Sequence, residues 1–268
     1  MRLAVLGSGS AGNALVVESE GRRLLVDAGF AGGTIERKLR QLGEEARRLD
    51  GVLLTHEHDD HRRGADVLAR RHGLPVYATA GTLAGTGLSE AAAAAARVVR
   101  SGEPFEVADW FRVEAFRLPH DAREPVGFVI EDGRGARLGL AYDLGSRSRL
   151  AWGRMRDLDA LVIEANHDLQ MLRAGPYPWH LKQRVASRHG HLSNRDAARG
   201  VAELACDRLR LVVLYHLSRT NNEPALAAQA VGAELDACGA GVELVVTRQD
   251  CSTPWIELEP HGQLSLAL

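Results

Sequence analysis

The sequence is poor in several residue types and patterns, and each shortage narrows what the protein can be. Three cysteines among 268 residues are too few and too scattered for a disulfide framework or a cysteine-rich metal site. No stretch approaches the roughly 20 apolar residues of a membrane span, and glycine interrupts the first apolar run too early for a secretion signal. We therefore expect a cytoplasmic protein with no membrane partner.

Excess charge and clustered aromatic residues are also lacking. A net charge of −2 gives no overall attraction to nucleic acid or membranes, so an anionic ligand would need a local basic patch. Arginine supplies almost all of that basic charge, because Lys38 and Lys182 are the only lysines. The four tryptophans are scattered and predict no platform for base stacking. A hydrophobic content of 45% nevertheless predicts a globular protein with a sizeable core.

Short apolar runs and helical patterns follow one another in the same order in both halves of the chain. Strands are predicted over residues 2–7, 13–19, 22–29, 51–56, 75–79, 110–118, 126–132, 137–143, 159–165, 209–216, 241–247 and 254–259. Helices are predicted over residues 34–43, 64–73, 91–96, 179–187, 194–206 and 223–237. Each half begins with strands and continues with strand–helix alternation, and no linker separates them. This order predicts one α/β domain over residues 1–268, built as a four-layer α/β/β/α sandwich.

A glycine loop near the start offers a different interpretation. Gly7, Gly9 and Gly12 form GxGxxG directly after a predicted strand, and Asp27 follows at the distance of a ribose-binding acid. A nicotinamide or flavin site, however, requires a helix after the last glycine, to hold the pyrophosphate. Here "NALVVESEGRRLLVD" follows, which is β-branched and interrupted by a turn. We therefore expect a glycine loop beside another kind of active site, and no dinucleotide cofactor.

The segment "LLTHEHDDHRRG" carries the strongest chemical pattern. His56 and His58 stand two residues apart after a predicted strand, and Asp60 and His61 follow where a helical pattern begins. Side chains two apart in extended backbone point the same way. Imidazole nitrogens and carboxylate oxygens together suit zinc, manganese or iron, and the lack of nearby cysteine argues against a closed structural zinc site. We therefore predict a catalytic metal site.

Further ligands are expected where later apolar runs end. His120 follows "VEAFRLP", Asp143 ends "LGLAYD" and His216 ends "LRLVVLYH". A sandwich of two sheets can bring such strand ends to one edge. Together with the early cluster, these residues fit a site for two metal ions.

The motif HxHxDH, present here as "HEHDDH", resembles that of the metallo-β-lactamase fold hydrolases, and the resemblance covers nearly the whole chain. It implies two divalent ions, zinc or manganese. One would be held by His56, His58 and His120, and the other by Asp60, His61 and His216. Asp143 would bridge the two ions, and Asp27 in "LLVDAG" would support the metal loop from behind.

Other motifs narrow the resemblance. "LGSGSAGNA", "AYDLG", "EANHD", "GHLSN" and "HLSRTNNEP" are similar to the YycJ (WalJ) group, which implies a 5′-to-3′ DNA exonuclease with DNA ends as its substrate. "GHLSNRDAA" also resembles RNase Z, in which the corresponding histidine, here His191, contacts the scissile phosphate. The long arm of RNase Z and the inserted domain of RNase J are not visible in this sequence.

This resemblance leads to a mechanistic hypothesis. Two metal ions can share a hydroxide near neutral pH, and that hydroxide would attack phosphorus in line with the leaving oxygen. Asp60 would orient the nucleophile, and a cationic His191 would stabilise the phosphate oxygen or protonate the leaving group.

Several residues around these motifs are candidate substrate contacts. Asn13 borders the glycine loop, and Ser193 and Asn194 stand at a predicted helix start, where free amides favour phosphate. Nearby arginines could contact the nucleic-acid backbone or simply face solvent; they are Arg184, Arg188 and Arg195. His167 could hold a ligand imidazole in place from behind.

Four other functions remain open at this stage. A thioesterase or glyoxalase-type hydrolase could use the same seven ligands, and a small cyclic phosphodiesterase could also use "GHLSN". A binding module would take up metal without turning over any substrate. A di-iron redox protein is disfavoured, because such proteins normally carry Glu at the position of His58.

Overall fold

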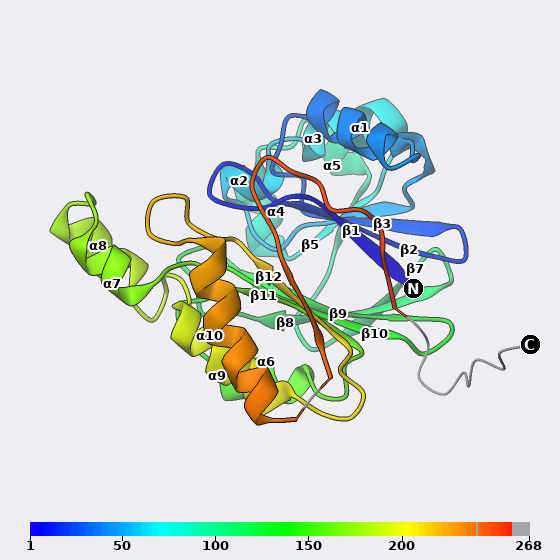
Figure 1. Ribbon diagram of the computed structural model, residues 1–268. Helices are drawn as coiled ribbons and strands as arrows, with labels where there is room; N and C mark the ends of the chain where they lie inside the picture. Colours follow the sequence, from blue (N-terminus) through cyan, green and yellow to red (C-terminus); the bar gives the residue numbers. More distant parts are fainter. Residues whose placement is uncertain (240, 259–268) are drawn as a thin grey trace, which may run out of the picture.

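Two mixed β-sheets pack face to face, and helices cover both outer faces (Figure 1). The structure is a computed structural model and describes residues 1–239 and 241–258. The four-layer α/β/β/α prediction is confirmed. No helix within these two ranges is long and apolar enough to span a bilayer.

The first sheet has the spatial order β14-β1-β2-β3-β4-β5-β6. Its strands are β1 (Arg2–Gly7), β2 (Ala14–Ser19), β3 (Arg22–Val26), β4 (Gly51–Leu53), β5 (Val76–Ala78), β6 (Ala96–Val98) and β14 (Ile256–Glu257). Pairing is antiparallel from β14 to β3 and parallel from β3 to β6. The outer helices α1 (Gly32–Gln41), α3 (Ala65–His72) and α5 (Glu90–Ala94) cover its outer face.

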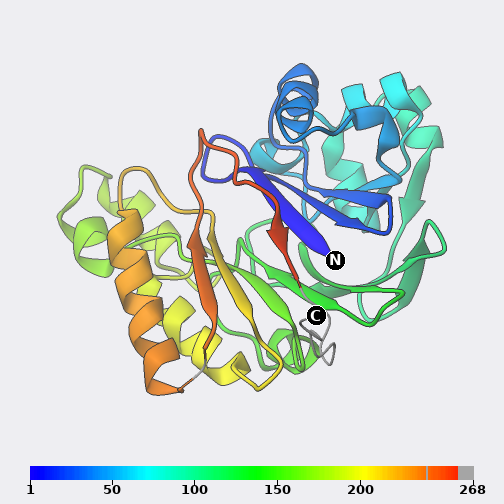
Figure 2. The same ribbon diagram turned by 45° about the vertical axis from the view of Figure 1, so that its right-hand side comes forward.

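The second sheet has the order β13-β12-β11-β10-β9-β8-β7. Its strands are β7 (Pro104–Val107), β8 (Phe111–Arg117), β9 (Val126–Asp132), β10 (Arg137–Ala141), β11 (Ala160–Glu164), β12 (Leu211–Tyr215) and β13 (Glu243–Val246). Strands β7 to β10 are antiparallel, and β10 to β13 are parallel. Helices α6 (Arg149–Arg154), α9 (Asn194–Leu204) and α10 (Pro224–Ala237) cover this sheet on its outer side (Figure 2).

The remaining helices lie near the strand ends: α2 (Asp59–Arg62), α4 (Ala80–Thr86), α7 (Leu169–Ala174), α8 (Trp179–Val185) and a 3-10 turn at Ala46–Arg48. Helices α7 and α8 project from the body beside the ends of β11 and β12 (Figure 1).

Burial on both sheet faces explains why the strands read as continuous apolar runs. In β1, Leu3 and Val5 face the core between the sheets, whereas Ala4 and Leu6 face the outer helices. Successive side chains of a strand point to opposite faces, so a strand covered on both sides needs apolar residues throughout.

The glycine loop leads into a strand, as its sequence indicates. β2 begins at Ala14, two residues after Gly12, so within the described chain no helix N-terminus follows the loop to hold a pyrophosphate.

Some short elements were not predicted. Strand β7 and helices α4, α6 and α7 are absent from the sequence-based assignment, and Ala96, predicted in a helix, begins β6. The predicted strand at residues 254–259 is reduced to β14, and Glu259 lies outside the described residues.

Candidate metal centre

The carboxyl ends of the parallel strands bring chemically active residues to one rim of the sandwich. Asp27 follows β3, Asp143 and His216 follow β10 and β12 within two residues, and Glu164 ends β11. Three of them have left-handed backbone, with φ of 58° at Asp27, 55° at Asp143 and 56° at His216. This conformation is unfavourable for residues other than glycine and tends to occur at functional sites.

Three histidines form the first cluster of this rim. His56 and His58 come from the loop after β4, and His120 comes from the loop after β8. Nε2 of His56 lies 3.0 Å from Nδ1 of His58, and Nε2 of His120 lies 3.3 Å from the same atom. Burial lowers the pKa of His56 and of His120, which favours the neutral imidazole that binds metal.

The second cluster contains Asp60, His61 and His216, whose candidate ligand atoms lie within 4.8 Å of one another. Oδ2 of Asp60 is 3.5 Å from Nε2 of both histidines. Asp143 lies between the two clusters. Its carboxylate is close to the ring nitrogens of His56 and His61 on one side and to that of His216 on the other. The structure therefore brings together all seven residues of the two ligand sets, from segments up to 160 positions apart.

Four of the histidines have their second ring nitrogen held by another group. The pairs are His56 Nδ1 with Thr55 Oγ1 at 3.0 Å, His61 Nδ1 with Asp27 Oδ2 at 2.7 Å, His120 Nδ1 with the Gly190 carbonyl at 3.2 Å, and His216 Nδ1 with Glu164 Oε1 at 3.1 Å. Metal-binding histidines are almost always oriented in this way, which leaves the other nitrogen free to face the ion.

An unpartnered carboxylate oxygen tests whether a cation fits here. Oδ2 of Asp143 is buried and accepts no hydrogen bond from the described residues, although Nε2 of His61 lies 2.9 Å away. Asp27 and Glu164 are fully buried beside it. Three buried carboxylates at one rim require positive charge. Nitrogen and carboxylate donors are the ligands that zinc and manganese take, so the residues fit divalent metal.

Asp27 lies behind the loop that carries the first histidines. Its carboxylate accepts hydrogen bonds from Thr55 N and Oγ1 and from Tyr142 Oη, besides the contact with His61. Both oxygens are therefore in use, and the His61 ring is fixed in direction.

Glu164 was missed by the sequence analysis, although a signal was present. It ends the buried run "DALVIEA" just as Asp143 and His216 end theirs. Its Oε1 lies 2.7 Å from His191 Nδ1, and its Oε2 accepts from the Leu192 amide at 3.2 Å. A single buried carboxylate thus holds His216 and His191 together.

His191 lies at the mouth of the site, with 22% of its side chain exposed. Burial opposes its positive charge, but the carboxylates of Glu164 and Asp143 outweigh burial and raise its pKa to about 10. These carboxylates therefore favour the charged form of His191, which lines the same cavity as both residue clusters.

The predicted substrate contacts Asn13, Ser193 and Asn194 are occupied inside the protein. Asn13 is buried and accepts from Ser8 Oγ and the Gly9 amide, which orders the glycine loop. Ser193 Oγ accepts from the Asp196 amide as the N-cap of α9, and Asn194 bonds Asn222. Nδ2 of Asn13 also lies 3.1 Å from Nε2 of His61, and contact of these three residues with a substrate stays a prediction.

The supporting role of His167 stays a prediction, and its neighbour Asn166 contacts a proposed ligand directly. Nδ1 of His167 has no hydrogen-bond partner among the described residues. Asn166 instead donates to the His216 carbonyl at 2.9 Å, and its Nδ2 lies 3.3 Å from His216 Nδ1.

A cavity of about 200 Å³ opens onto both clusters. Ser10 of the glycine loop lines one side, and Leu181 and Arg184 of α8 line another. Arg184 is 63% exposed and pairs with Asp121 at 2.9 Å across the rim. Arg188 and Arg195 are also exposed nearby in the chain.

Comparison with known proteins agrees with this geometry. The family model described as "Beta-lactamase superfamily domain" matches residues 22–217. Exodeoxyribonuclease YycJ of Bacillus anthracis is 37% identical over 90% of this chain and 92% of its own length. Exodeoxyribonuclease WalJ of Streptococcus pneumoniae serotype 2 is 35% identical over 96% of this chain and 98% of its own.

Solved structures share the same fold. Zn²⁺-bound PqqB from Methylobacterium extorquens has a TM-score of 0.68 and 21% identity, covering 94% of this chain and 99% of that one. The short form of human tRNase Z has a TM-score of 0.67 and 20% identity, covering 97% of this chain and 100% of that one.

The fold, the rim of histidines and carboxylates, and the family match place the chain in the β-lactamase superfamily, as a member with a metallo-β-lactamase fold. Within that superfamily, its identity to YycJ and WalJ over nearly the full length of each chain places it in the exodeoxyribonuclease YycJ/WalJ family.

Proposed function

We propose that this protein is a metal-dependent exonuclease that digests DNA from 5′ ends. The single observation that carries the proposal is the full-length similarity to two proteins named exodeoxyribonucleases, at 37% and 35% identity. The chain is a metallo-hydrolase acting on phosphodiester bonds, whereas DNA as substrate and the direction of digestion belong to the proposal. We also infer that residues 1–268 act as one domain.

The seven residues of the rim are the proposed ligands of two divalent ions, zinc or manganese. When bound, such ions supply a nucleophile at neutral pH and stabilise charge on the attacking and leaving oxygens. The protein itself must fix the ligand rings. His61 and His216 are fixed by the hydrogen bonds that they donate through Nδ1 to the carboxylates of Asp27 and Glu164.

Asp60 and His191 have the proposed direct roles in the reaction. Asp60 lines the cavity with 23% of its side chain exposed, which lets a free carboxylate oxygen orient the attacking water. His191 lines the same cavity as a cation, and Glu164 holds its Nδ1. Its Nε2–H is then available to donate to a phosphate oxygen or to pass a proton to the leaving alkoxide.

Digestion of 5′-end-labelled and 3′-end-labelled duplex DNA with Mn²⁺, Zn²⁺ or a chelator tests this proposal. We expect metal-dependent release of nucleotides from the 5′ end, no cleavage by Asp60→Ala, and a rate roughly 10²–10⁴-fold lower for His191→Ala, the usual contribution of one general acid or base. His191→Ala should still retain its metal, measured by elemental analysis. Intact duplex together with cleavage of bis-(p-nitrophenyl) phosphate would refute the nuclease and favour a small phosphodiesterase.

A further inference from the structure

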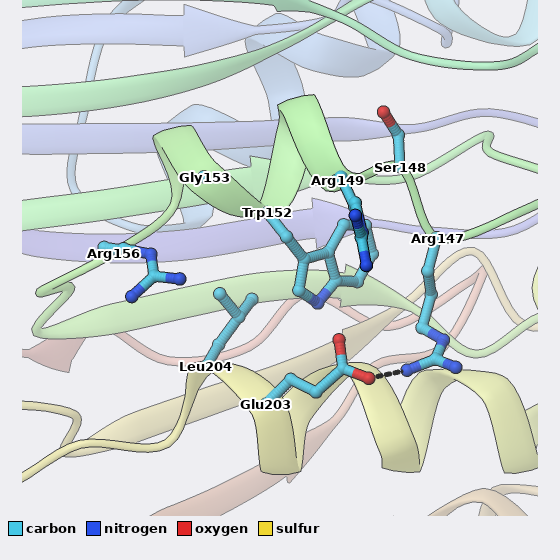
Figure 3. Close-up of a pocket in the computed structure, with 8 residues that line it drawn as sticks. All are labelled: Arg147, Ser148, Arg149, Trp152, Gly153, Arg156, Glu203 and Leu204. Atoms are coloured by element: carbon cyan, nitrogen blue, oxygen red, sulfur yellow. Dashed lines mark hydrogen bonds and ion pairs between the residues drawn. The ribbon is translucent and has the colours of Figure 1, made fainter.

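A second cavity, of about 590 Å³, lies between α6 and the carboxyl end of α9, away from the metal ligands (Figure 3). Arg147, Arg149 and Arg156 line it, with Trp152 in the middle and Glu203 opposite. None of these residues belongs to the metal centre, and the chemistry proposed above uses none of them.

The charge of this cavity is positive and partly unpaired. Arg147 forms an ion pair with Glu203, as Figure 3 shows. Arg149 and Arg156 are exposed, and within the described chain neither has a carboxylate within 4.0 Å. Two guanidinium groups are therefore free to bind an anion, and arginine favours phosphate through paired N–H donors.

The floor of the cavity is apolar and closely packed. Trp152 is 7% exposed, and its Nε1–H donates to the Gly200 carbonyl at 3.1 Å. A Cβ at Gly200 would lie 2.6 Å from the indole ring, so glycine is needed for this close packing. Because the indole N–H is already used, a ligand would be recognised by the arginines rather than by the tryptophan.

The arginines are distributed in a way that suits several phosphates rather than one. Figure 3 shows Arg156 on one side of Trp152, and Arg147 and Arg149 on the other. Arg149 begins α6 and Arg156 follows its end, so the two come from opposite ends of the helix. A chain of phosphates can reach both sides of the tryptophan.

Two further arginines lie on the path from the metal centre to this cavity. Helix α9 begins three residues after His191, and Arg195 and Arg199 stand one turn apart on its exposed face, followed one turn later by Glu203. Neither arginine has a carboxylate within 4.0 Å among the described residues. The axial rise from Asn194 to Glu203 is about 14 Å, which corresponds to about four nucleotides of one strand in a duplex, at 3.4 Å per phosphate along the axis.

The loop between Asp143 and Arg147 also connects the metal centre to the α6–α9 cavity. Asp143 and Arg147 are four residues apart, so their Cα atoms lie within about 14 Å of each other. Gly145, between them, packs against the backbone of Arg188 and Gly190, where a Cβ would lie 2.4 Å from either residue. The path from proposed active site to cavity is thus short and its backbone is tightly packed.

We propose that the α6–α9 cavity and the arginines of α9 form a binding track for the sugar–phosphate backbone of a nucleic-acid strand several nucleotides from the cleaved bond. This inference rests on the proposed nuclease function and adds a separate binding site to it. The track explains how a protein with a net charge of −2 can hold a polyanion.

Binding by the metal-free protein, in chelator, tests this inference without relying on activity. The probes are a fluorescein-labelled 20-nucleotide single strand, measured by anisotropy between 50 and 200 mM salt, and AMP, measured by calorimetry. For Arg149→Ala/Arg156→Ala we expect about 10-fold weaker binding of the 20-mer and a salt slope lower by about 1.4, the value for two phosphate contacts on a single strand. Arg149→Lys/Arg156→Lys should recover most of the loss, because it keeps both charges.

Arg37→Ala/Arg40→Ala is the matched control. It removes two exposed arginines from α1, on the opposite outer layer, and should bind the 20-mer like the wild type. An equal loss of 20-mer binding in this control would show that binding depends only on the overall charge of the protein, and would overturn the proposed track. Unchanged 20-mer binding by the Arg149/Arg156 variant would overturn it as well, and so would an equal loss for AMP, which would make the cavity a nucleotide pocket.

The two proposals fail in different ways. Absence of metal-dependent DNA cleavage by the wild type would refute the nuclease, whatever the binding data show. DNA cleavage by the wild type together with unchanged binding by the double variant would refute only the track.

Discussion

Single residues behind the proposed ligands set the direction of the histidine rings, and Asp27 is the clearest case. Its carboxylate forms hydrogen bonds with His61, Thr55 and Tyr142, and its backbone has the left-handed conformation. Asp27→Asn keeps the size but loses an acceptor for either His61 or Tyr142. We expect 10–100-fold weaker metal binding, the usual effect of losing such a partner, measured by competition with a chromophoric chelator.

Asp132 provides a matched control for Asp27→Asn. It is also a buried carboxylate, bonded to Ser19 Oγ and to backbone amides in the β9–β10 turn, away from the metal clusters. Asp132→Asn should lower the melting temperature without changing metal affinity. Equal metal binding by Asp27→Asn and wild type would contradict the role given to Asp27.

Sequence reasoning found residues by their place at the ends of apolar runs. This rule placed Asp143 and His216 at the same rim, and it applied equally to Glu164, which was overlooked. Ser193 was proposed on another ground, its place at a helix start, and there its oxygen caps the backbone of its own helix. Whether a polar side chain faces a cavity or the chain itself depends on tertiary packing, which the sequence pattern does not contain.

At the scale of elements, a carboxylate ties α3 to the start of α5. Asp66 Oδ1 accepts from the Ser89 amide at 2.9 Å and from Ser89 Oγ at 2.6 Å, and its Oδ2 pairs with Arg70. The hydrogen bonds from Ser89, followed by that from Arg70, lower the pKa of Asp66 to about 2. The folded state therefore stabilises the ionised form of Asp66 more than the unfolded chain does.

Asp66→Asn should lower the free energy of unfolding by about 1 kcal/mol at pH 7. Because the pKa is depressed on folding, this contribution is present above the unfolded value near 4 and is lost as the pH falls towards 2. Urea denaturation at pH 7, 4 and 2.5 measures it, and the difference between wild type and variant should shrink on acidification. Glu45→Gln, which removes an exposed carboxylate paired with Arg47, should have a much smaller effect at pH 7.

Long elements were predictable, whereas several short helices were not. The predicted strand at residues 126–132 coincides with β9, and the helix predicted from residue 194 begins there as α9. Helix α6 has only six residues and α7 likewise, which is too short for a helical period to stand out. The position of α6 depends on tertiary packing, in which Trp152 contacts Gly200 of α9.

For the whole molecule, bound metal should add stability, because three buried carboxylates then gain a counter-charge. At a free Zn²⁺ concentration 100 times the dissociation constant, the gain is about 2.7 kcal/mol, or roughly 5–10 °C in melting temperature for a chain of this size. Differential scanning fluorimetry with and without chelator measures this shift. His56→Ala/His58→Ala, which removes two proposed ligands of one ion, should reduce this shift, and His191→Gln should keep it. No shift for the wild type, together with no metal in elemental analysis, would contradict the metal centre.

The proposed ligands are divided between two sheets and spread along the chain from His56 to His216. A chain still being synthesised can therefore display the first histidines long before the last one leaves the ribosome. Until β12 has docked beside β11, the ligand set of the second ion lacks His216, and the two-ion site is incomplete. Hydrolysis would begin only when the second half of the chain has folded onto the first, so a growing polypeptide would carry no premature nuclease.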